Sequence, residues 1–354
     1  MKVLITGGAG FIGSHVAEYY ANETDVERVF VIDNLSRSRL LNKNEGTQLH
    51  NWAFLESFKK IKRYKNDVRN FKFLREFFNI NDIDVVVHTA GQTAVTTSLS
   101  NPLNDFENNI LGSFNLLEAV RLSKLNPIMI YCSTNKVFGN NVNKCEVVES
   151  ESRYDFSEKY FNGISETFPI DLCEHTPYGA SKLCSDLYFQ EYGHIYGINT
   201  GVFRMSCIYG TRQYGVEDQG WIAHFVISAI KGKKLKVFGN GKQVRDILYI
   251  SDLVEAFDSY IKKSNSLGNE VFCIGGGSEN SISLLELIHI LEKKLDKKLE
   301  YDTFDWRPSD QKVYISDISK AKKLLGWEPQ VNKLNGIKKL INWVQNDKLI
   351  ANID

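Results

Sequence analysis

The chain has 354 residues, of which 43% are hydrophobic and 24% are charged, as is typical of globular proteins. Because 43 Lys and Arg residues balance 43 Asp and Glu residues, we expect neither nucleic acid nor an anionic membrane as a partner, since both bind strongly basic surfaces. No apolar run reaches the roughly 18 residues that span a bilayer, no signal peptide is expected, and six cysteines without a CxxC pair indicate free thiols in the cytoplasm.

Short apolar runs alternate with longer segments of helical periodicity along the first part of the chain. The runs that are typical of buried parallel strands are residues 2–5, 29–32, 85–88 and 128–131. The candidate helices between and after them are residues 11–22, 108–122 and 177–193. This alternation predicts an α/β fold with a Rossmann-like, doubly wound parallel sheet.

The pattern becomes less regular after Arg204, and the tail is mainly helical at 283–295 and 320–344. We therefore expect a dinucleotide-binding Rossmann domain followed by a smaller mixed α/β C-terminal lobe that binds the substrate. The expected boundaries are 1–204 plus 245–274 for the first domain, and 205–244 plus 275–354 for the lobe. The cleft between the two is the natural place for a substrate.

A glycine-rich turn joins the first predicted strand to the first predicted helix. Gly7, Gly10 and Gly13 have the spacing at which a tight turn, a close approach to a pyrophosphate and helix–strand packing all require glycine. The helix N-terminus adds unpaired N–H groups that favour phosphate. Asp33 ends the second strand, 20 residues after Gly13, where a carboxylate accepts hydrogen bonds from ribose hydroxyls and repels a 2′-phosphate. The pattern predicts NAD.

Two alternatives to this interpretation remain open. Arg37 and Arg39 are close to Asp33 in sequence and could bind the 2′-phosphate of NADP. The glycines could also form an ordinary turn, with Asp33 capping a helix. The coincidence of the glycine spacing with Asp33 favours NAD over both.

Tyr178 and Lys182 lie four residues apart on the third candidate helix, so their side chains share one helix face. A tyrosine hydroxyl has a pKa of ~10, and a neighbouring ammonium lowers that pKa and makes tyrosine a usable base. Thr134 follows the strand at 128–131, whose carboxyl end points at the ligand crevice, and could bond the same substrate hydroxyl. An exposed Tyr–Lys pair and an ordinary Ser/Thr loop are the structural alternatives.

Together these motifs resemble the extended short-chain dehydrogenases/reductases, the superfamily of NAD-dependent nucleotide-sugar epimerases and dehydratases. The resemblance covers essentially the whole chain. It is carried by residues 6–13 (TGGAGFIG), 67–68, 88–92, 109, 178–182, 245–246 and 307–308. It implies the same fold, a nucleotide-sugar substrate, NAD as cofactor and a homodimer or homotetramer.

The resemblance also implies a set of site residues. The catalytic residues would be Thr134, Tyr178 and Lys182. The cofactor would contact Gly7, Gly10, Phe11, Ile12, Gly13, Asp33, Asn34, Asp67, Val68, Ala90, Gln92, Asn109, Tyr178 and Lys182. The substrate would contact Thr134, Cys207, Gln219, Trp221, Arg245 and Arg307, with the two arginines on the diphosphate, because guanidinium groups bind phosphate oxygens in pairs.

Longer strings resemble, within this superfamily, nucleotide-sugar 2-epimerases that act on CDP-linked sugars. These strings are residues 92–98, 133–137, 204–210 and 215–221. Asn135 and Lys136 stand where 4,6-dehydratases carry an acidic pair, which disfavours water elimination, and Cys207 stands where 4-epimerases usually have Asn. Phe138 replaces the usual Tyr of the same region. A 4-epimerase or other nucleotide-sugar enzyme is the first alternative, and a non-catalytic NAD-binding regulatory protein is the second.

Other residues give weaker signals. No metal site is expected, because the seven histidines show no ligand spacing, and His88 is expected to be structural or to lie beside the cofactor. Trp221 and Phe225 could stack on a base, although aromatic residues four apart are more often part of a core. The lysine-rich stretches at 231–236 and 293–298 are expected to be solvated faces.

Overall fold

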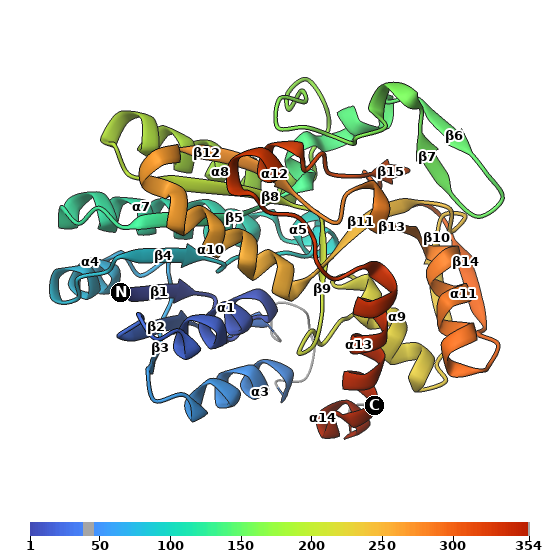
Figure 1. The fold of residues 1–354 in the computed structure, drawn as a ribbon, viewed down its shortest axis with the longest axis horizontal. Coiled ribbons are helices and arrows are strands. Elements are labelled where there is room, and N and C mark those ends of the chain that lie inside the picture. Colours follow the sequence, from blue (N-terminus) through green and yellow to red (C-terminus); the bar gives the residue numbers. More distant parts are fainter. Residues whose placement is uncertain (38–45, 353–354) are drawn as a thin grey trace.

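The computed structural model describes residues 1–37 and 46–352 of the chain (Figure 1). Within them, seven strands form one sheet in the order β12-β8-β5-β4-β1-β2-β3, and each neighbouring pair is parallel. The strands are β1 (Lys2–Thr6), β2 (Arg28–Asp33), β3 (Ile61–Lys65), β4 (Val85–His88), β5 (Ile128–Thr134), β8 (Thr200–Met205) and β12 (Glu270–Ile274). The predicted Rossmann-like sheet is confirmed.

Helices cover both faces of this sheet (Figure 1). One face carries α1 (Phe11–Asn22), α10 (Ile250–Leu267) and α12 (Ser319–Leu325), and the other carries α4 (Phe71–Ile80), α7 (Gly112–Ser123) and α8 (Thr176–Tyr196). Side chains of one strand alternate between the two faces: Val3 and Ile5 belong to the first core cluster and Leu4 to the second. Because both faces are buried, the strands are apolar at nearly every position.

A second group of elements lies beside the carboxyl ends of the sheet, on the right of Figure 1. Its four-stranded sheet contains β9 (Cys207–Tyr209), β11 (Val244–Tyr249), β13 (Ser281–Ser283) and β15 (Val313–Tyr314). The parallel pair β10 (Leu235–Phe238) and β14 (Tyr301–Phe304) joins α9 (Trp221–Ile230), α11 (Leu284–Leu295) and α13 (Lys333–Asn346). The domain division stays a prediction. At its 245–274 segment, α10 and β12 join the Rossmann part, whereas β11 pairs within the smaller sheet.

Shorter elements connect these parts. They are α3 (Gly46–Phe54), η1 (Leu55–Ser57), α5 (Val95–Ser100), α6 (Pro102–Phe106), the π-helix η2 (Glu107–Leu111), η3 (Asn135–Lys144), β6 (Val147–Glu149), β7 (Tyr154–Phe156), η4 (Glu158–Tyr160), η5 (Ser278–Asn280) and α14 (Lys348–Asn352). The antiparallel hairpin of β6 and β7, together with η3, packs on β15 and forms a third core cluster. None of the helices in the described residues has the length and apolar character that crossing a membrane requires.

Candidate active site

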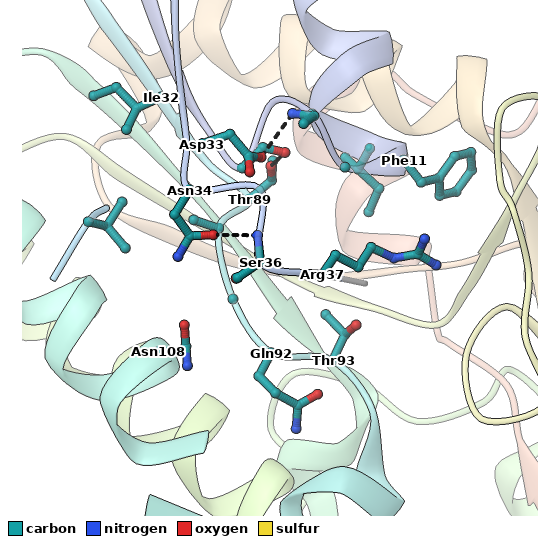
Figure 2. A pocket seen from close by; sticks show the side chains of 18 of the residues that line it. Phe11, Ile32, Asp33, Asn34, Ser36, Arg37, Thr89, Gln92, Thr93 and Asn108 are labelled. Atoms are coloured by element: carbon teal, nitrogen blue, oxygen red, sulfur yellow. Dashed lines mark hydrogen bonds between the residues drawn. The ribbon is translucent and has the colours of Figure 1, made fainter. Parts of the chain in front are cut away.

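The first of two neighbouring pockets opens at the carboxyl ends of β1, β2, β3 and β4 and has a volume of about 1070 Å³ (Figure 2). It is lined by Gly7, Ala9, Gly10, Phe11, Ile12, Gly13, Ile32, Asp33, Asn34, Ser36, Arg37, Asn66, Val68, Thr89, Ala90, Gly91, Gln92, Thr93, Asn108 and Gln219. In a doubly wound sheet this edge is where ligands bind. Most of the residues that the sequence assigned to the cofactor lie here.

The glycine turn leaves no room for side chains. Gly7 has φ +74°, and a Cβ built on it would lie 2.6 Å from the backbone nitrogen of Ala90. A Cβ on Gly13 would lie 2.4 Å from the carbonyl oxygen of Gly7. α1 begins at Phe11 and directs its first N–H groups and the positive end of its dipole to this edge. The turn therefore fits a pyrophosphate held close to the backbone.

Asp33 lies at the end of β2 with both carboxylate oxygens fixed by the backbone. They accept hydrogen bonds from Ala9 N at 2.9 Å and Leu35 N at 2.7 Å, and burial raises the pKa of the Asp33 carboxyl. The carboxylate faces the pocket (Figure 2). These contacts orient it as an acceptor for hydroxyl groups, as binding of the ribose of NAD requires.

Asp67 lies between two residues that line the first pocket, and its contact with the cofactor stays a prediction. Asn66 and Val68 line the pocket, whereas Asp67 accepts hydrogen bonds from Asn34 Nδ2 at 2.8 Å and from Arg69 Nη2 at 2.8 Å. Burial opposes ionisation of Asp67, but the hydrogen bonds and the charge of Arg69 prevail and lower its pKa. Asp67 therefore supports Asn34 from behind the pocket wall.

Arg37 is held by the segment that precedes α9. Its Nε and Nη2 donate to Gln219 Oε1 at 3.2 and 3.0 Å, and Nη2 also donates to the Tyr214 carbonyl oxygen at 3.2 Å. Gln219 donates in turn to the hydroxyl of Thr93. Gln219, expected to bind substrate, thus lines the first pocket, and Arg37 is already engaged at the ribose end. Arg39 lies outside the described residues.

A buried polar network supports the pocket floor. Asn109 Oδ1 accepts from Gln92 N at 2.8 Å, and Asn109 Nδ2 donates to Ser181 Oγ at 3.0 Å. Asp105, 1% exposed, accepts from Gln92 Nε2 at 2.8 Å and Ser181 Oγ at 2.5 Å. The sequence interpretation missed Asp105. Its position four residues before Asn109, on the same helical stretch, could have indicated that the two side chains are neighbours.

Thr134 ends β5, and Tyr178 and Lys182 lie one turn apart near the start of α8. A hydrogen bond links Thr134 to Tyr178, yet burial outweighs it and raises the pKa of Tyr178 to about 12. Burial lowers the pKa of Lys182 to about 8, and the Lys182 ammonium lies 4.2 Å from the centre of the Tyr131 ring. The pKa of Tyr178 is thus raised by burial, and Lys182 is not among the groups that shift it, so the lowering of this pKa by Lys182 stays a prediction.

The start of α8 is fixed by unusual backbone geometry. Thr176 has φ +60°, a conformation that a β-branched residue rarely adopts, and Pro177 at the first turn has no N–H to satisfy. The N–H of Tyr178 donates to Ser98 Oγ at 3.1 Å. Strain of this kind often accompanies functional sites, and here it sets the position of Tyr178.

The second pocket lies against the smaller lobe and has a volume of about 1110 Å³. It is lined by Val95, Thr96, Leu99, Asn135, Lys136, Cys207, Glu217, Asp218, Trp221, His224, Phe225, Lys236, Phe238, Gln243, Arg245, Leu284, Arg307, Pro308 and Asp310. Four residues expected to bind substrate, Cys207, Trp221, Arg245 and Arg307, are therefore brought together. Thr134 immediately precedes the lining residue Asn135.

Three cations of this pocket are paired with carboxylates that the sequence interpretation did not include. Arg245 Nη2 contacts Asp310 Oδ1 at 2.5 Å, and Arg307 Nη2 contacts Asp218 Oδ1 at 3.1 Å. Lys236 contacts Glu217 at 3.0 Å and lines the pocket while staying exposed, and Lys233 and Lys234 are exposed too, as expected of a solvated face. Two features of the sequence could have indicated these partners. Acidic residues occupy positions 217 and 218 within the string 215–221, and Asp310 follows Arg307 by three residues.

Aromatic rings form the apolar part of the same wall. Trp221 and Phe225 pack edge to face with centroids 5.9 Å apart, and Trp221 Nε1 donates to Cys207 Sγ at 3.4 Å. The Arg307 guanidinium lies 3.9 Å from the centre of the Phe238 ring. Such surfaces suit a nucleotide base and a diphosphate side by side.

Two residues singled out in the sequence lie away from both pockets. His88 is buried, is bonded to Thr6 Oγ1 at 2.6 Å and Ser113 Oγ at 3.0 Å, and has its pKa lowered to about 3 by burial and by the nearby charge of Lys182. Phe138 is fully buried in the third core cluster. Across residues 1–37 and 46–352, no group of three or more His, Cys, Asp or Glu side chains could hold a metal ion.

Residues 4–340 match the family model described as GDP-mannose 4,6 dehydratase. The chain belongs to this family of NAD-dependent nucleotide-sugar epimerases and dehydratases, the extended short-chain dehydrogenases/reductases. Membership confirms the expected enzyme class and NAD as the cofactor. The glycine turn and the Asp33 carboxylate of the first pocket fit this cofactor.

Relatives within the family span several reactions. A CDP-paratose 2-epimerase of Salmonella typhi is 38% identical over 351 residues, 98% of this chain and 100% of the relative. A UDP-glucuronate 4-epimerase of Thermodesulfobacterium geofontis is 34% identical, covering 99% and 98%. The crystal structure of a UDP-glucuronic acid 4-epimerase from Bacillus cereus, in complex with UDP-glucuronic acid and NAD, superposes with a TM-score of 0.81 at 28% identity, covering 98% of this chain and 99% of that one.

Proposed function

We propose that this protein inverts C2 of a CDP-linked sugar, converting CDP-paratose into CDP-tyvelose by transient oxidation at C2. The observation that carries the proposal is the chemistry of the two residues that follow Thr134 in sequence. Asn135 and Lys136 line the second pocket with an amide and an ammonium. Neither side chain supplies the carboxyl acid–base pair by which the dehydratases of the family eliminate water. The 38% identity to a CDP-paratose 2-epimerase over the full chain supports the same reaction.

The roles of the chain's own residues follow from their positions. Tyr178 accepts the proton of the C2 hydroxyl, and Thr134, already hydrogen-bonded to Tyr178, orients the reacting oxygen. NAD, when bound, supplies the hydride acceptor and adds a positive charge that favours the phenolate. Lys182, one helix turn after Tyr178, would contact the nicotinamide ribose when NAD is bound. Buried surroundings keep water from the reacting carbon.

The substrate's other groups are held in the second pocket. Arg245 and Arg307 bind the diphosphate, since guanidinium groups suit phosphate oxygens. Trp221, Phe225 and Phe238 offer ring faces and edges to the base. Cys207 lines the same pocket beside Trp221, where a small thiol would leave room for the sugar.

Incubation with a panel of CDP-, UDP- and GDP-linked sugars, followed by NMR, tests the proposal. The expected result is inversion at C2 of the CDP-linked 3,6-dideoxy sugar and little turnover of the others. Turnover confined to a UDP- or GDP-sugar, or loss of water from any substrate, would contradict it.

A 4-epimerase is the second candidate. Two relatives favour it: the UDP-glucuronate 4-epimerase at 34% identity and a putative UDP-glucose 4-epimerase of Methanocaldococcus jannaschii at 32% over 350 residues. The same Thr134, Tyr178 and Lys182 would serve at C4. Inversion at C4 in the NMR panel identifies this reaction. Absence of any turnover would favour the non-catalytic alternative, against which the presence of Thr134, Tyr178 and Lys182 in the sequence argues.

We also propose a homodimer built on α7 and α8. Phe114 and Tyr188 pack together with centroids 5.5 Å apart and are 36% and 40% exposed. Leu103, Phe106 and Leu187 add large exposed apolar side chains on α6 and α8, two helices that contact each other, and a gathering of exposed apolar side chains favours an interface. Sedimentation should give twice the chain mass for the wild type. A Phe114→Glu/Tyr188→Glu variant should sediment as a monomer.

The cytoplasm is the proposed location. All six cysteines are free thiols, and Cys132, Cys145 and Cys273 are buried, as expected for a reducing compartment. Titration of the denatured protein, purified without reductant, should give six thiols per chain.

A further inference from the structure

Lys136 is placed between the catalytic residues and the substrate arginines. It follows Thr134 by two positions at the start of η3, is partly buried, and lines the second pocket. Its ammonium donates one hydrogen bond, to the carbonyl oxygen of Ser309 at 3.3 Å. Within the described residues, no carboxylate oxygen lies within 4.0 Å of it.

The other cations of this pocket differ from Lys136 in having carboxylate partners. Arg245 is paired with Asp310, Arg307 with Asp218, and Lys236 with Glu217. An anion that binds to any of these must compete with the carboxylate already there. An anion that binds to Lys136 meets a cation without a carboxylate in direct contact, since the nearby Asp310 is paired with Arg245, in surroundings where charge–charge attraction is stronger than in water.

We propose that Lys136 is a substrate-binding residue that holds an oxygen of the nucleotide sugar's diphosphate. This inference rests on the proposed function only in taking a nucleoside diphosphate sugar as the ligand. It does not depend on which base is bound or on which carbon is inverted. Lys136 thus anchors the diphosphate at its sugar side, next to Thr134, while Arg245 and Arg307 hold it farther along the pocket.

The charge of Lys136 makes this contact sensitive to pH. Burial is the main reason that the pKa of Lys136 falls to about 8, and the charge of Arg245 lowers it further, whereas Asp310 and Cys207 raise it. A bound diphosphate stabilises the ammonium and raises the pKa. Binding is therefore at full strength below about pH 8 and weakens as the pH rises above that value.

Calorimetric titration of the NAD-loaded protein with CDP, UDP, GDP and dTDP, without turnover, tests the proposal. The nucleotide that the wild type binds best is then titrated into variants. Lys136→Met should weaken binding about 10- to 100-fold, as expected for a charge-assisted hydrogen bond. The exposed Lys234, paired with Asp302 outside the pocket, provides the control, and Lys234→Met should change the affinity by less than about twofold.

Two further arms separate a binding role from a structural one. Lys136→Arg should retain the affinity at pH 7 and, unlike the wild type, keep it at about pH 9.5, because arginine stays protonated. The matching nucleoside without phosphates should bind Lys136→Met and wild type equally. Melting temperature and NAD content report whether each variant is folded.

Four results would overturn the proposal. They are an unchanged affinity of Lys136→Met for the diphosphate, an equal loss for the nucleoside, a wild-type affinity that does not fall between pH 7 and about 9.5, and a wild type that binds none of the four nucleotides. Preference for UDP, or inversion at C4, would instead contradict the proposed function and leave the role of Lys136 standing.

Discussion

Arg37 and Gln219 lie 182 positions apart in sequence, yet the Arg37 guanidinium donates two hydrogen bonds to the Gln219 side-chain oxygen. Gln219 also donates a hydrogen bond to the hydroxyl of Thr93, and all three residues line the cofactor pocket. The segment before α9 is therefore tied across the pocket that fits NAD. These bonds connect the segment before α9 to the sheet edge beside the pocket that fits the cofactor.

Gln219→Ala should release NAD faster than the wild type. The substitution removes both hydrogen bonds between Arg37 and Gln219. Because hydrogen bonds to a charged group are stronger than neutral ones, their loss should raise the dissociation rate of NAD about 10-fold. Gln219→Glu keeps an acceptor for Arg37 and should retain the cofactor. The measurement is the nucleotide left after extensive dialysis, identified by chromatography. The released nucleotide should be NAD, and equal retention by the alanine variant would contradict the role of the Gln219 bridge.

Tyr178→Phe should keep the fold and NAD binding but lose most turnover. It removes the proton acceptor, and general-base catalysis accounts for roughly 10²–10⁴ in rate. Thr134→Val should cost less, because it removes orientation and one hydrogen bond. Steady-state kinetics with the substrate that the NMR panel identifies gives both values. A kcat near that of the wild type in Tyr178→Phe would show that another group takes the proton.

The stability of the protein should fall in mild acid because of His88. Burial lowers the pKa of His88 from 6.5 to about 3 in the folded state. Between these two pH values the unfolded chain binds a proton at His88 and the folded chain does not. Stability from this group is complete above about pH 6.5 and decreases as the pH falls toward 3. His88→Gln should melt at a lower temperature at pH 7 but lose less stability between pH 7 and about 5. The exposed His289 is the control, and His289→Gln should leave the wild-type slope unchanged.

The sequence predicts those features that are set locally. The strands β1, β2, β4 and β5 are continuous apolar runs, and Gly7, Gly10, Gly13 and Asp33 occur within one strand–turn–helix–strand unit. β3 escaped the prediction because it is an edge strand, with the polar sequence IKRYK and partial exposure. The cofactor pocket lies at the carboxyl ends of the parallel strands, which is where a doubly wound sheet binds ligands.

Relationships between distant segments could not be predicted. Pairing of Arg245 with Asp310 and of Arg307 with Asp218 depends on where separate loops meet. The position of the Lys182 ammonium over Tyr131 depends on the packing of α8 on β5. Four-residue spacing places Lys182 and Tyr178 on one face of α8 but does not decide which group the ammonium contacts.

The path of the hydrogen at C2 tests the central claim most directly. Substrate deuterated at C2 is turned over in ordinary water, and the complementary reaction runs in D₂O with unlabelled substrate. Transfer to and from NAD within a closed site does not exchange with solvent. The account therefore predicts a C2-inverted product that keeps its deuterium in water and gains none at C2 in D₂O. Loss of the label at the rate of turnover would contradict it.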